Sequence, residues 1–485
     1  MLENKTMNTK PNIIVLIVDA FRYDHTNFSN YFRDTTPFLS QCASDAFLFT
    51  HTFTNSTKSG LSLASMTTSS YAFEYKSPVE IKPPRIPLSE LLHQVGYYTA
   101  LTSSNPYYEE EFGYHRGVDF YKMLFNRKEE LKRIAEKGFF VRAFKTASKN
   151  TLYQNLKEFL KKKARKLYEV GRIGKTVLTT RKNSFGAADL VNGAIFAALK
   201  NYKQSQPIFL WAHYMDLHAP NLPPRNFLKK FGRNIPKYQQ LLSWKKRSIT
   251  PPPTFSQEEI DDMILLYDAC LAYIDESIKE VISELKRLNI YDNSLIIITG
   301  DHGEAFGEHG DIGHHGHYDF LYDEYLHVPL LIKFPGNEKG LCHEIVSLID
   351  IAPTILDLAD VAFPSFFRGT SLKPLLNNRE LDLPQVETFS GKENYIIAFA
   401  APKLSPRAFK DIDFNKPSFA IRTKNWKLIV GPCNREELYD LNRDHQERIN
   451  LLQSSEKKDR IYDLRSKLYD KLKPYLLTLR DLQKL

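Results

Sequence analysis

The sequence has few cysteines and no long hydrophobic run. Its four cysteines, Cys42, Cys270, Cys342 and Cys433, are scattered without CxxC spacing, which argues against a disulfide framework and a thiolate zinc site. The first apolar stretch is far too short to span a bilayer, and no small-residue cleavage site follows it. Because no secretion signal is visible, we expect a cytoplasmic protein. We also find no internal repeat and no low-complexity tract.

The composition is that of an ordinary globular protein. With 485 residues, of which 42% are hydrophobic and 25% charged, the chain can form one large domain and a smaller appendage. Strand-like and helix-like segments alternate along it, which predicts an α/β fold. We expect a main domain over residues 1–385 and a smaller subdomain over residues 386–485, with a small antiparallel sheet and a terminal helix.

One short apolar run ends in acid and imidazole side chains. Residues 294–300 (SLIIITG) are mostly apolar and rich in β-branched residues, which is typical of a strand buried on both faces of a sheet. Asp301 and His302 follow directly, and more histidines come soon after: His309, His314, His315 and His317. Carboxylates and imidazoles are ligands for divalent cations. The alternative is an ordinary polar turn with a few hydrogen-bonded histidines.

Two further apolar runs end in the same way. Residues 12–18 lead into Asp19, and residues 207–212 lead into a polar group that consists of His213, Asp216 and His218. In open, mostly parallel α/β sheets, ligands bind beyond the carboxyl ends of the strands. We therefore expect the three polar groups to meet in one crevice, because unrelated solvated turns do not explain three such groups in distant parts of the chain.

Several other segments have recognisable patterns. We expect helices over residues 185–202 and 351–359, a long helix that starts at the capping box of Ser256 and Glu259, and strands over residues 98–102, 328–334, 395–400 and 419–430. The proline-rich, basic loop over residues 220–253 is predicted to act as a lid over the crevice.

One segment carries the positive charge of the chain. The net charge is +9, and residues 127–182 hold 18 Lys and Arg against 5 Asp and Glu. Within it, apolar residues recur at helical spacing beside lysines and arginines, which predicts an amphipathic basic helix. One interpretation is a solvent-exposed helix whose lysine side chains cover the domain with their methylene groups. The alternative is a helix that binds anionic lipid or steers a polyanionic substrate. Nucleic acid is not an expected partner, because few aromatic residues lie between these charges.

Ser59 is the candidate nucleophile. It begins a stretch of small and hydroxyl residues, 59–66, that can open a helix after a loop. A hydroxyl at a helix N-terminus faces free backbone N–H groups, which suits an attacking oxygen beside a bound anion. A coordinated cation stabilises the alkoxide that a serine alone does not form at neutral pH. For an isolated serine, the alternative is a helix cap.

Taken in order, these motifs resemble the sulfatase family of the alkaline phosphatase superfamily, over most of the chain. The matching segments are PNIIVLIVDAFRYDH, SGLSLASMTT from Ser59, HYMDLHAP from His213, GDHGEAFGEHG from Gly300, VPLLIKFPG, VSLIDIAPTILDLA, and the closing RTKNWKLI and ELYDLNRD. The resemblance implies an alkaline phosphatase-like α/β fold, with a mostly parallel central sheet flanked by helices and a small C-terminal α+β subdomain.

The resemblance also implies an activity. The implied activity is hydrolysis of sulfate or phosphate esters through a covalent intermediate on Ser59. By position, the ligands of one divalent metal match Asp19, Ser59, Asp301 and His302. His218 and His317 match positions that contact the substrate or transfer protons, a task that imidazole performs near neutral pH.

Two departures from the family pattern matter. Sulfatases convert a cysteine or serine to formylglycine within C/S-x-P-x-R, whereas Leu61 and Leu63 replace the proline and the arginine here, so we do not expect formylglycine at Ser59. Many sulfatases also place a second acid after the first, where this chain has Ala20. The result resembles single-metal phosphoester-processing relatives, such as phosphoethanolamine and glycerol-phosphate transferases. With one imidazole among the ligands, Ca²⁺, Mn²⁺ and Zn²⁺ are all compatible.

The sequence thus predicts a metal-dependent hydrolase of a small or polymeric sulfate or phosphate ester. One alternative is a phosphoryl or phosphodiester transferase with unmodified serine. The other is a catalytically silent protein whose basic segment binds an anionic surface, which would place it at the membrane periphery.

The basic segment leads to a direct test. If residues 127–182 bind anionic lipid, deleting them should lower co-sedimentation of the protein with anionic liposomes at low salt, because the attraction is electrostatic and is screened by added salt. Equal co-sedimentation of the two proteins at low salt would end the membrane hypothesis.

Overall fold

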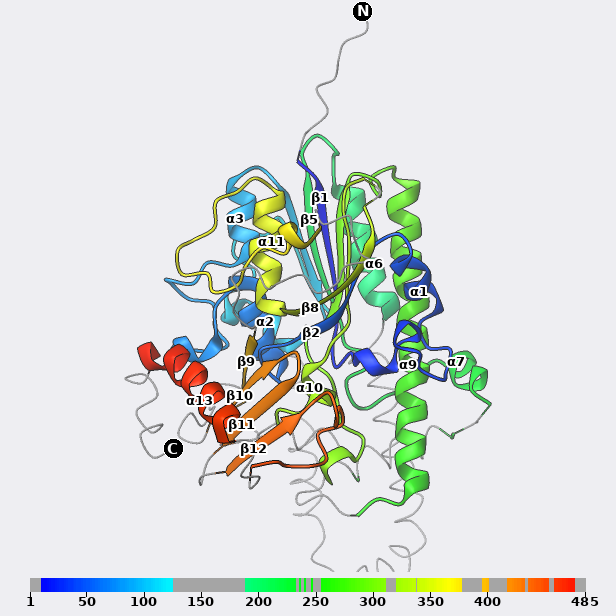
Figure 1. The fold of residues 1–485 in the computed structure, drawn as a ribbon. Helices are drawn as coiled ribbons and strands as arrows, with labels where there is room; N and C mark the ends of the chain where they lie inside the picture. Colours follow the sequence, from blue (N-terminus) through cyan, green and yellow to red (C-terminus); the bar gives the residue numbers. More distant parts are fainter. Residues whose placement is uncertain are drawn as a thin grey trace, which may run out of the picture.

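An eight-stranded sheet forms the centre of this computed structural model (Figure 1). The structure describes residues 10–124, 188–232, 235–236, 240, 246, 254–310, 320–336, 338–376, 395–400, 417–431, 435–452 and 458–475. The strands are, in spatial order, β4 (Phe120–Met123), β3 (Tyr98–Ser103), β5 (Ile208–Tyr214), β1 (Asn12–Val18), β6 (Ser294–Gly300), β7 (Leu330–Lys333), β2 (Phe47–Phe53) and β8 (Gly340–Ser347).

The sheet is mostly parallel, as predicted. Strand β1 lies at its middle and pairs in parallel with β5 on one side and with β6 on the other. Strand β7 is antiparallel to both of its neighbours, β6 and β2, which the sequence pattern did not indicate. Because β1, β5 and β6 run in the same direction, the residues that follow them emerge at one edge of the sheet.

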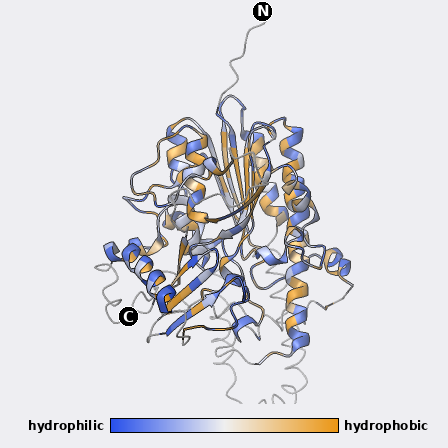
Figure 2. Ribbon diagram, in the orientation of Figure 1, coloured by the Kyte–Doolittle hydropathy of each residue, from blue (hydrophilic) through white to orange (hydrophobic). Residues whose placement is uncertain are grey.

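Helices cover both faces of this sheet (Figure 1). On one face lie α2 (Ser59–Thr68), α3 (Leu88–Gln94) and α11 (Ile351–Leu358); on the other lie α6 (Ala188–Asn201) and α9 (Gln257–Arg287), with α1 (Pro37–Ala43) and α7 (Arg225–Lys230) packed against α9. Figure 2 shows that α9 has an apolar and a polar side. The predicted capping box is present, with Ser256 and Glu259 each bonded to the other's backbone N–H.

Alternate residues of each central strand serve the two cores. In β1, Ile13, Val15 and Ile17 belong to the core that contains α2 and α11, whereas Ile14, Leu16 and Val18 belong to the core that contains α6 and α9. This explains the continuous apolar run, because both faces of the strand are covered. The bounds predicted for β1 and β6 are confirmed to the residue.

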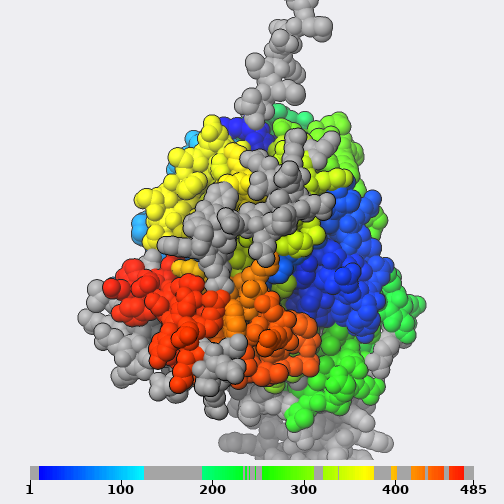
Figure 3. All heavy atoms as spheres, viewed as in Figure 1, coloured from blue at the N-terminus to red at the C-terminus, as the bar shows by residue number. Residues whose placement is uncertain are grey.

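A second sheet of four antiparallel strands lies beside the first. Its order is β12 (Arg435–Asp440), β11 (Trp426–Gly431), β10 (Ser418–Thr423) and β9 (Tyr395–Ala400). The other α-helices among the described residues are α10 (Asp323–Leu326), α12 (Lys373–Leu376) and α13 (Lys458–Leu472). One face of the small sheet packs against α13, and the other packs against Phe53 and Leu326. Figure 3 shows these C-terminal segments, in orange and red, against the rest of the molecule.

Two predictions concern residues outside the described parts of the chain, and a third is left untested. The basic segment 127–182 lies outside the described residues, and so does the predicted domain boundary at residue 385. The loop over residues 220–253 contains α7, and its role as a lid stays a prediction. No helix in the described parts of the chain combines the length and the apolarity needed to cross a bilayer.

A buried ion-pair cluster ties the small sheet to the main domain. Lys427 of β11 is fully buried, and its Nζ lies 2.9 Å from Asp323 and 2.7 Å from Glu447. Arg422 of β10 binds the same Asp323 carboxylate at 2.9 Å. Two cations thus balance two carboxylates between the sheets, so losing one partner leaves a buried charge uncompensated.

We expect Lys427→Ala to lower the free energy of unfolding by about 3–5 kcal/mol, because Asp323 and Glu447 lose a partner that they cannot replace with water. Urea denaturation measures this. The control is Arg443→Ala: the side chain is 83% exposed and lies 4.0 Å from Asp440, so its loss should cost less than about 1 kcal/mol. Equal effects of the two substitutions would contradict the structural role of Lys427.

Candidate active site

Three predicted metal ligands meet at the carboxyl end of the central strands. Because Val18 of β1 is in register with Gly300 of β6, Asp19 and Asp301 follow neighbouring strands at the same level. Ligand atoms of Asp19, Asp301 and His302 all lie within 4.8 Å of one another, and all three side chains are buried. The convergence predicted from the sequence is confirmed for these residues.

Ser59 joins the cluster from α2. Its hydroxyl donates a hydrogen bond to Asp19 Oδ2 over 2.9 Å and lies 3.1 Å from His302 Nε2. It is the first residue of the helix, and its hydroxyl is turned to the cluster rather than used as a cap. One turn later, Ser62 Oγ donates to the backbone carbonyl of Asp301 over 2.7 Å, which fixes the helix start against the end of β6.

The loop before Ser59 is held by the small C-terminal sheet. The backbone N–H of Phe399 in β9 donates to the carbonyl of Asn55, and the Asn55 side-chain amide donates to the carbonyl of Ile397, both over 2.9 Å. Ser347 Oγ donates to the other side-chain atom of this amide, Oδ1 of Asn55, also over 2.9 Å. The position of Ser59 therefore depends on both sheets.

Backbone groups orient the two ligands after β6. Asp301 Oδ1 accepts hydrogen bonds from the N–H of Ala20 at 3.1 Å and of His302 at 2.9 Å, which turns Oδ2 toward the cluster. His302 Nδ1 lies 2.7 Å from the carbonyl of Gly303, so Nδ1 carries a proton, and Nε2 is the ring nitrogen that faces Ser59. Ala20 adopts a left-handed backbone with φ of 55°, which brings its N–H to Asp301.

The donor set fits a divalent cation. Asp19 Oδ1 and Asp301 Oδ2 are buried without a hydrogen-bond partner among the described residues. Burial, followed by the charge of Asp301, raises the pKa of Asp19 to about 7. Burial also acts to raise the pKa of Asp301, but His302 and His213 outweigh it and lower that pKa. Two carboxylates and an imidazole nitrogen are ligands that suit a divalent cation.

His218, the predicted substrate-side histidine, lies near this cluster. Its Nδ1 is 2.7 Å from the carbonyl of Ala219. Burial lowers the pKa of His218, and the charges of Glu304 and Asp301 partly oppose this, so these acids are within electrostatic reach. The other predicted substrate-side histidine, His317, lies outside the described residues, together with His314 and His315.

Two residues of the predicted groups, Asp216 and His309, serve elsewhere, and so does Arg22, which follows β1 in the chain. Asp216 Oδ1 accepts a hydrogen bond from the N–H of Ala188 in α6 over 3.2 Å. Burial raises the pKa of Asp216 to about 7. Asp216 therefore holds the start of α6. Arg22 binds Asp24 and Glu308, which ties the segment after β1 to the loop after β6. His309 contacts the Glu324 side chain through Nδ1 and the carbonyl of Glu447 through Nε2. Both of these residues come later in the chain.

One residue at the site, Asn105, was not singled out from the sequence, and another, His213, was named but expected beyond the end of its strand. Asn105, just after β3, donates from Nδ2 to Asp19 Oδ2 over 3.4 Å, and the rule that polar residues follow strands would have found it. His213 was predicted to follow its strand, but β5 continues through Tyr214 and buries it completely. Its Nε2 lies 3.5 Å from Asp301 Oδ2.

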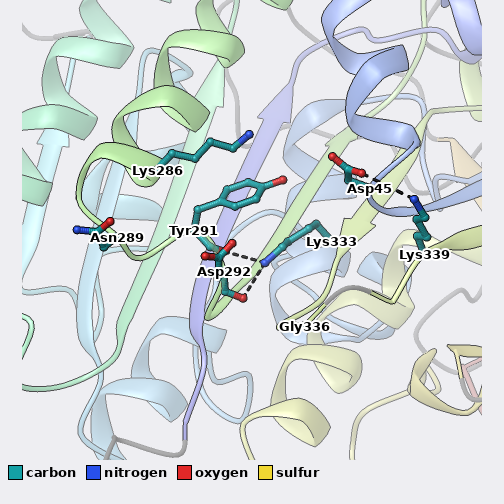
Figure 4. Close-up of a pocket in the computed structure, with 8 residues that line it drawn as sticks. All are labelled: Asp45, Lys286, Asn289, Tyr291, Asp292, Lys333, Gly336 and Lys339. Carbon is teal, nitrogen blue, oxygen red and sulfur yellow. Dashed lines mark hydrogen bonds and ion pairs between the residues drawn. The ribbon is translucent and has the colours of Figure 1, made fainter.

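A separate cavity of about 610 Å³ lies near the opposite end of the strands (Figure 4). It is lined by Asp45, Lys286, Asn289, Tyr291, Asp292, Lys333, Gly336 and Lys339. Lys333 Nζ donates to the carbonyls of Tyr291 (2.7 Å), Asp292 (2.8 Å) and Ser294 (3.3 Å), which uses its three hydrogens. The lysine thus braces the loop before β6, and the cavity is remote from Ser59.

Two protein-family models match the sequence of this chain. The family model described as Sulfatase matches residues 11–168 and 187–361, and the model described as N-sulphoglucosamine sulphohydrolase, C-terminal, matches residues 313–473. The chain belongs to the sulfatase family. Arylsulfatase K of Mus musculus is 31% identical over 201 residues, which cover 41% of this chain and 34% of that protein. This sulfatase-family chain therefore matches only about a third of the relative's length.

Solved structures agree with the fold of this sulfatase family member. A protein in complex with its substrate D-glucosamine-2-N,6-O-disulfate has a TM-score of 0.68 at 19% identity, covering 96% of this chain and 98% of the other. The phosphonate monoester hydrolase of Agrobacterium radiobacter has a TM-score of 0.68 at 17% identity, covering 96% of each chain. At these identities the likeness establishes the fold alone, and it confirms the alkaline phosphatase-like architecture.

The loop that presents His302 has no room for a side chain at its next residue. A Cβ on Gly303 would lie 2.0 Å from the backbone oxygen of Glu324. We expect Gly303→Ala to displace the loop, to lower the melting temperature, and to weaken Mn²⁺ binding at least about tenfold in equilibrium dialysis. The control is Gly193→Ala in α6, where a Cβ meets nothing within 4 Å and binding should not change. Unchanged Mn²⁺ binding in the Gly303 variant would contradict the proposed donor set.

Proposed function

We propose that this protein hydrolyses sulfate or phosphate esters, with the Ser59 hydroxyl as the nucleophile and with one divalent cation as cofactor. The observation that carries the proposal is the position of Ser59 Oγ, 2.9 Å from Asp19 and 3.1 Å from His302, at the first turn of α2. A hydroxyl that contacts two metal-type ligands and opens a helix is suited to attack a tetrahedral anion.

The chain's own groups account for the substrate side of the reaction. Ser59 is the first residue of α2, and the field at the N-terminus of a helix favours an anionic ester beside it. Asp19 Oδ2 accepts the hydrogen of the Ser59 hydroxyl and can take up this proton during attack. We assign the proton for the leaving alcohol to a histidine, His218, and water then releases the sulfate or phosphate from Ser59.

Asp19, Asp301 and His302, with the Ser59 oxygen beside them, are the residues that would hold the cation. When bound, it supplies Lewis acidity that makes the Ser59 hydroxyl more acidic and offsets the charge of the anionic ester. The buried, unpartnered oxygens of Asp19 and Asp301 support this assignment. Mn²⁺, Zn²⁺ and Ca²⁺ all suit a set with two carboxylates and one imidazole.

The relatives set the range of substrates. Arylsulfatase K is named for sulfate esters, one structural relative was solved with a disulfated glucosamine, and another is a phosphonate monoester hydrolase. Sulfate, phosphate and phosphonate esters share a tetrahedral anionic centre, so one nucleophile and one cation serve all of them. The site therefore supports this broad class of esters and does not by itself select one ester within it.

A second candidate function is transfer of a phosphoryl or phosphodiester group to an alcohol. It is favoured by Leu61 and Leu63, which replace the proline and arginine of the formylglycine sequence and leave Ser59 as an unmodified hydroxyl. An unmodified serine forms an ester intermediate that either water or another alcohol can attack. The mass of the peptide that contains Ser59 distinguishes free serine, formylglycine and a trapped phosphoryl group.

The test is a side-by-side assay of an aryl sulfate, a phosphate monoester and a phosphodiester with Mn²⁺, Zn²⁺ or Ca²⁺. We expect turnover of at least one ester, loss of turnover on chelation, recovery on adding the metal, and a loss of more than about 10³-fold in Ser59→Ala. The matched control is Ser65→Ala, which removes a buried hydroxyl from the same helix without touching the cluster.

Each outcome has a meaning. Turnover that survives Ser59→Ala would overturn the role of Ser59, and turnover that survives chelation would overturn the role of the cation. Sulfate turnover by protein whose Ser59 peptide has the mass of free serine would count against the need for formylglycine. A folded protein that binds anionic liposomes and turns over none of the three esters would favour the catalytically silent alternative.

A further inference from the structure

His213 is an unexplained polar residue inside the core. It lies within β5, is fully buried, and has no hydrogen-bond partner at Nδ1 or Nε2 among the described residues. Burying an imidazole without partners is unfavourable, and such groups call for a specific explanation. The explanation should account for the direction in which this ring points.

The position of His213 in the sheet aims its ring at the cluster. It pairs with Ile17 of β1 and Ser103 of β3, and it shares a face with Trp211 and Phe209, which pack in the core that contains α2. This is the face of the sheet on which α2 presents Ser59. The His213 ring lies against the Tyr108 ring, with centroids 5.6 Å apart, so Tyr108 limits rotation of the imidazole.

One atom of the His213 ring faces a proposed metal ligand. His213 Nε2 lies 3.5 Å from Asp301 Oδ2, which is longer than the usual N–H···O hydrogen bond of about 2.9 Å. Asp301 Oδ1 already accepts two backbone N–H groups, whereas Oδ2 has no hydrogen-bond donor among the described residues. Both atoms that face each other here, Nε2 and Oδ2, are therefore unsatisfied.

His213 is not part of the compact donor set itself. The atoms that lie within 4.8 Å of one another come from Asp19, Asp301 and His302, and His213 is outside this group. It lies beside Oδ2 of Asp301, and outer residues of metal sites commonly hold a ligand by a hydrogen bond.

We infer that His213 is a positioning residue that donates from Nε2 to Asp301 Oδ2 and holds this oxygen in place for the cation. With Oδ1 fixed by two N–H groups and Oδ2 fixed by the imidazole, the carboxylate is oriented before the cation arrives. The oxygen keeps a lone pair for the cation while it accepts this hydrogen bond. The inference rests on the proposed function, because it assigns His213 to the same cation site.

The test uses two substitutions with the same amide group and different reach. In His213→Gln the amide nitrogen reaches the position of Nε2, whereas in His213→Asn it is one methylene too short. We expect His213→Asn to weaken Mn²⁺ binding 10–100-fold in equilibrium dialysis, and His213→Gln to stay within about threefold of the unchanged protein. His93→Asn, on the surface of α3, is the control and should bind Mn²⁺ like the unchanged protein.

Two further readouts separate positioning from other roles. Electron spin-echo spectroscopy of bound Mn²⁺ should show the same imidazole nitrogen coupling in all variants, because His213 is not a ligand in this arrangement. The melting temperatures of the metal-free variants should agree closely, because the hydrogen bond matters for the cation and not for the fold.

The outcomes are distinguishable. Equal Mn²⁺ affinity of the Asn and Gln variants and the unchanged protein would overturn the role of His213 and leave the proposed function intact. Loss of a nitrogen coupling in His213→Asn would overturn positioning in favour of direct ligation. A large drop in melting temperature of both metal-free variants would show a structural role instead. If the unchanged protein binds none of Mn²⁺, Zn²⁺ and Ca²⁺, the metal-dependent function fails, and this inference fails with it.

Discussion

The parallel pairing of β1 with β6 is the constraint on which the rest of the site depends. It brings Asp19 and Asp301, 282 positions apart in the chain, to the ends of adjacent strands at the same level. Both carboxylates are buried, and the charge of one raises the pKa of the other. A folded protein holds two such groups together only with a compensating positive charge, so the sheet geometry itself calls for a cation or a proton at this place.

The nucleophile is positioned by contacts that reach across the molecule. Ser62 fixes the first turn of α2 to the end of β6, and Asn55 fixes the preceding loop to β9 of the small sheet. The small sheet is in turn tied to the main domain through Lys427 and Asp323. The C-terminal subdomain is thus part of the support of the active site, although it contributes none of the four clustered residues.

Parts of the fold could be predicted because the local pattern was unambiguous. The runs over residues 12–18 and 294–300 are mostly apolar and are followed directly by a charged residue, so both strands were predicted to the residue. The strand predicted over residues 207–212 ends too early, because the first polar residue, His213, was taken as the point where the strand stops. The strand in fact continues, since His213 and Tyr214 still pair with Ile17 and Val18 of β1. A polar side chain does not end a strand whose neighbours keep pairing.

By itself, the sequence determined the residue types of the site, the strands that carry them and the family to which the chain belongs. These follow from local patterns, in which an apolar run makes a strand and a polar residue after it faces the crevice. Only the tertiary structure decided that Asp216 serves α6 while Asn105 and His213 lie beside the clustered carboxylates. That choice depends on strand order and register, which set the distance between side chains from different parts of the chain and are not encoded in any single segment.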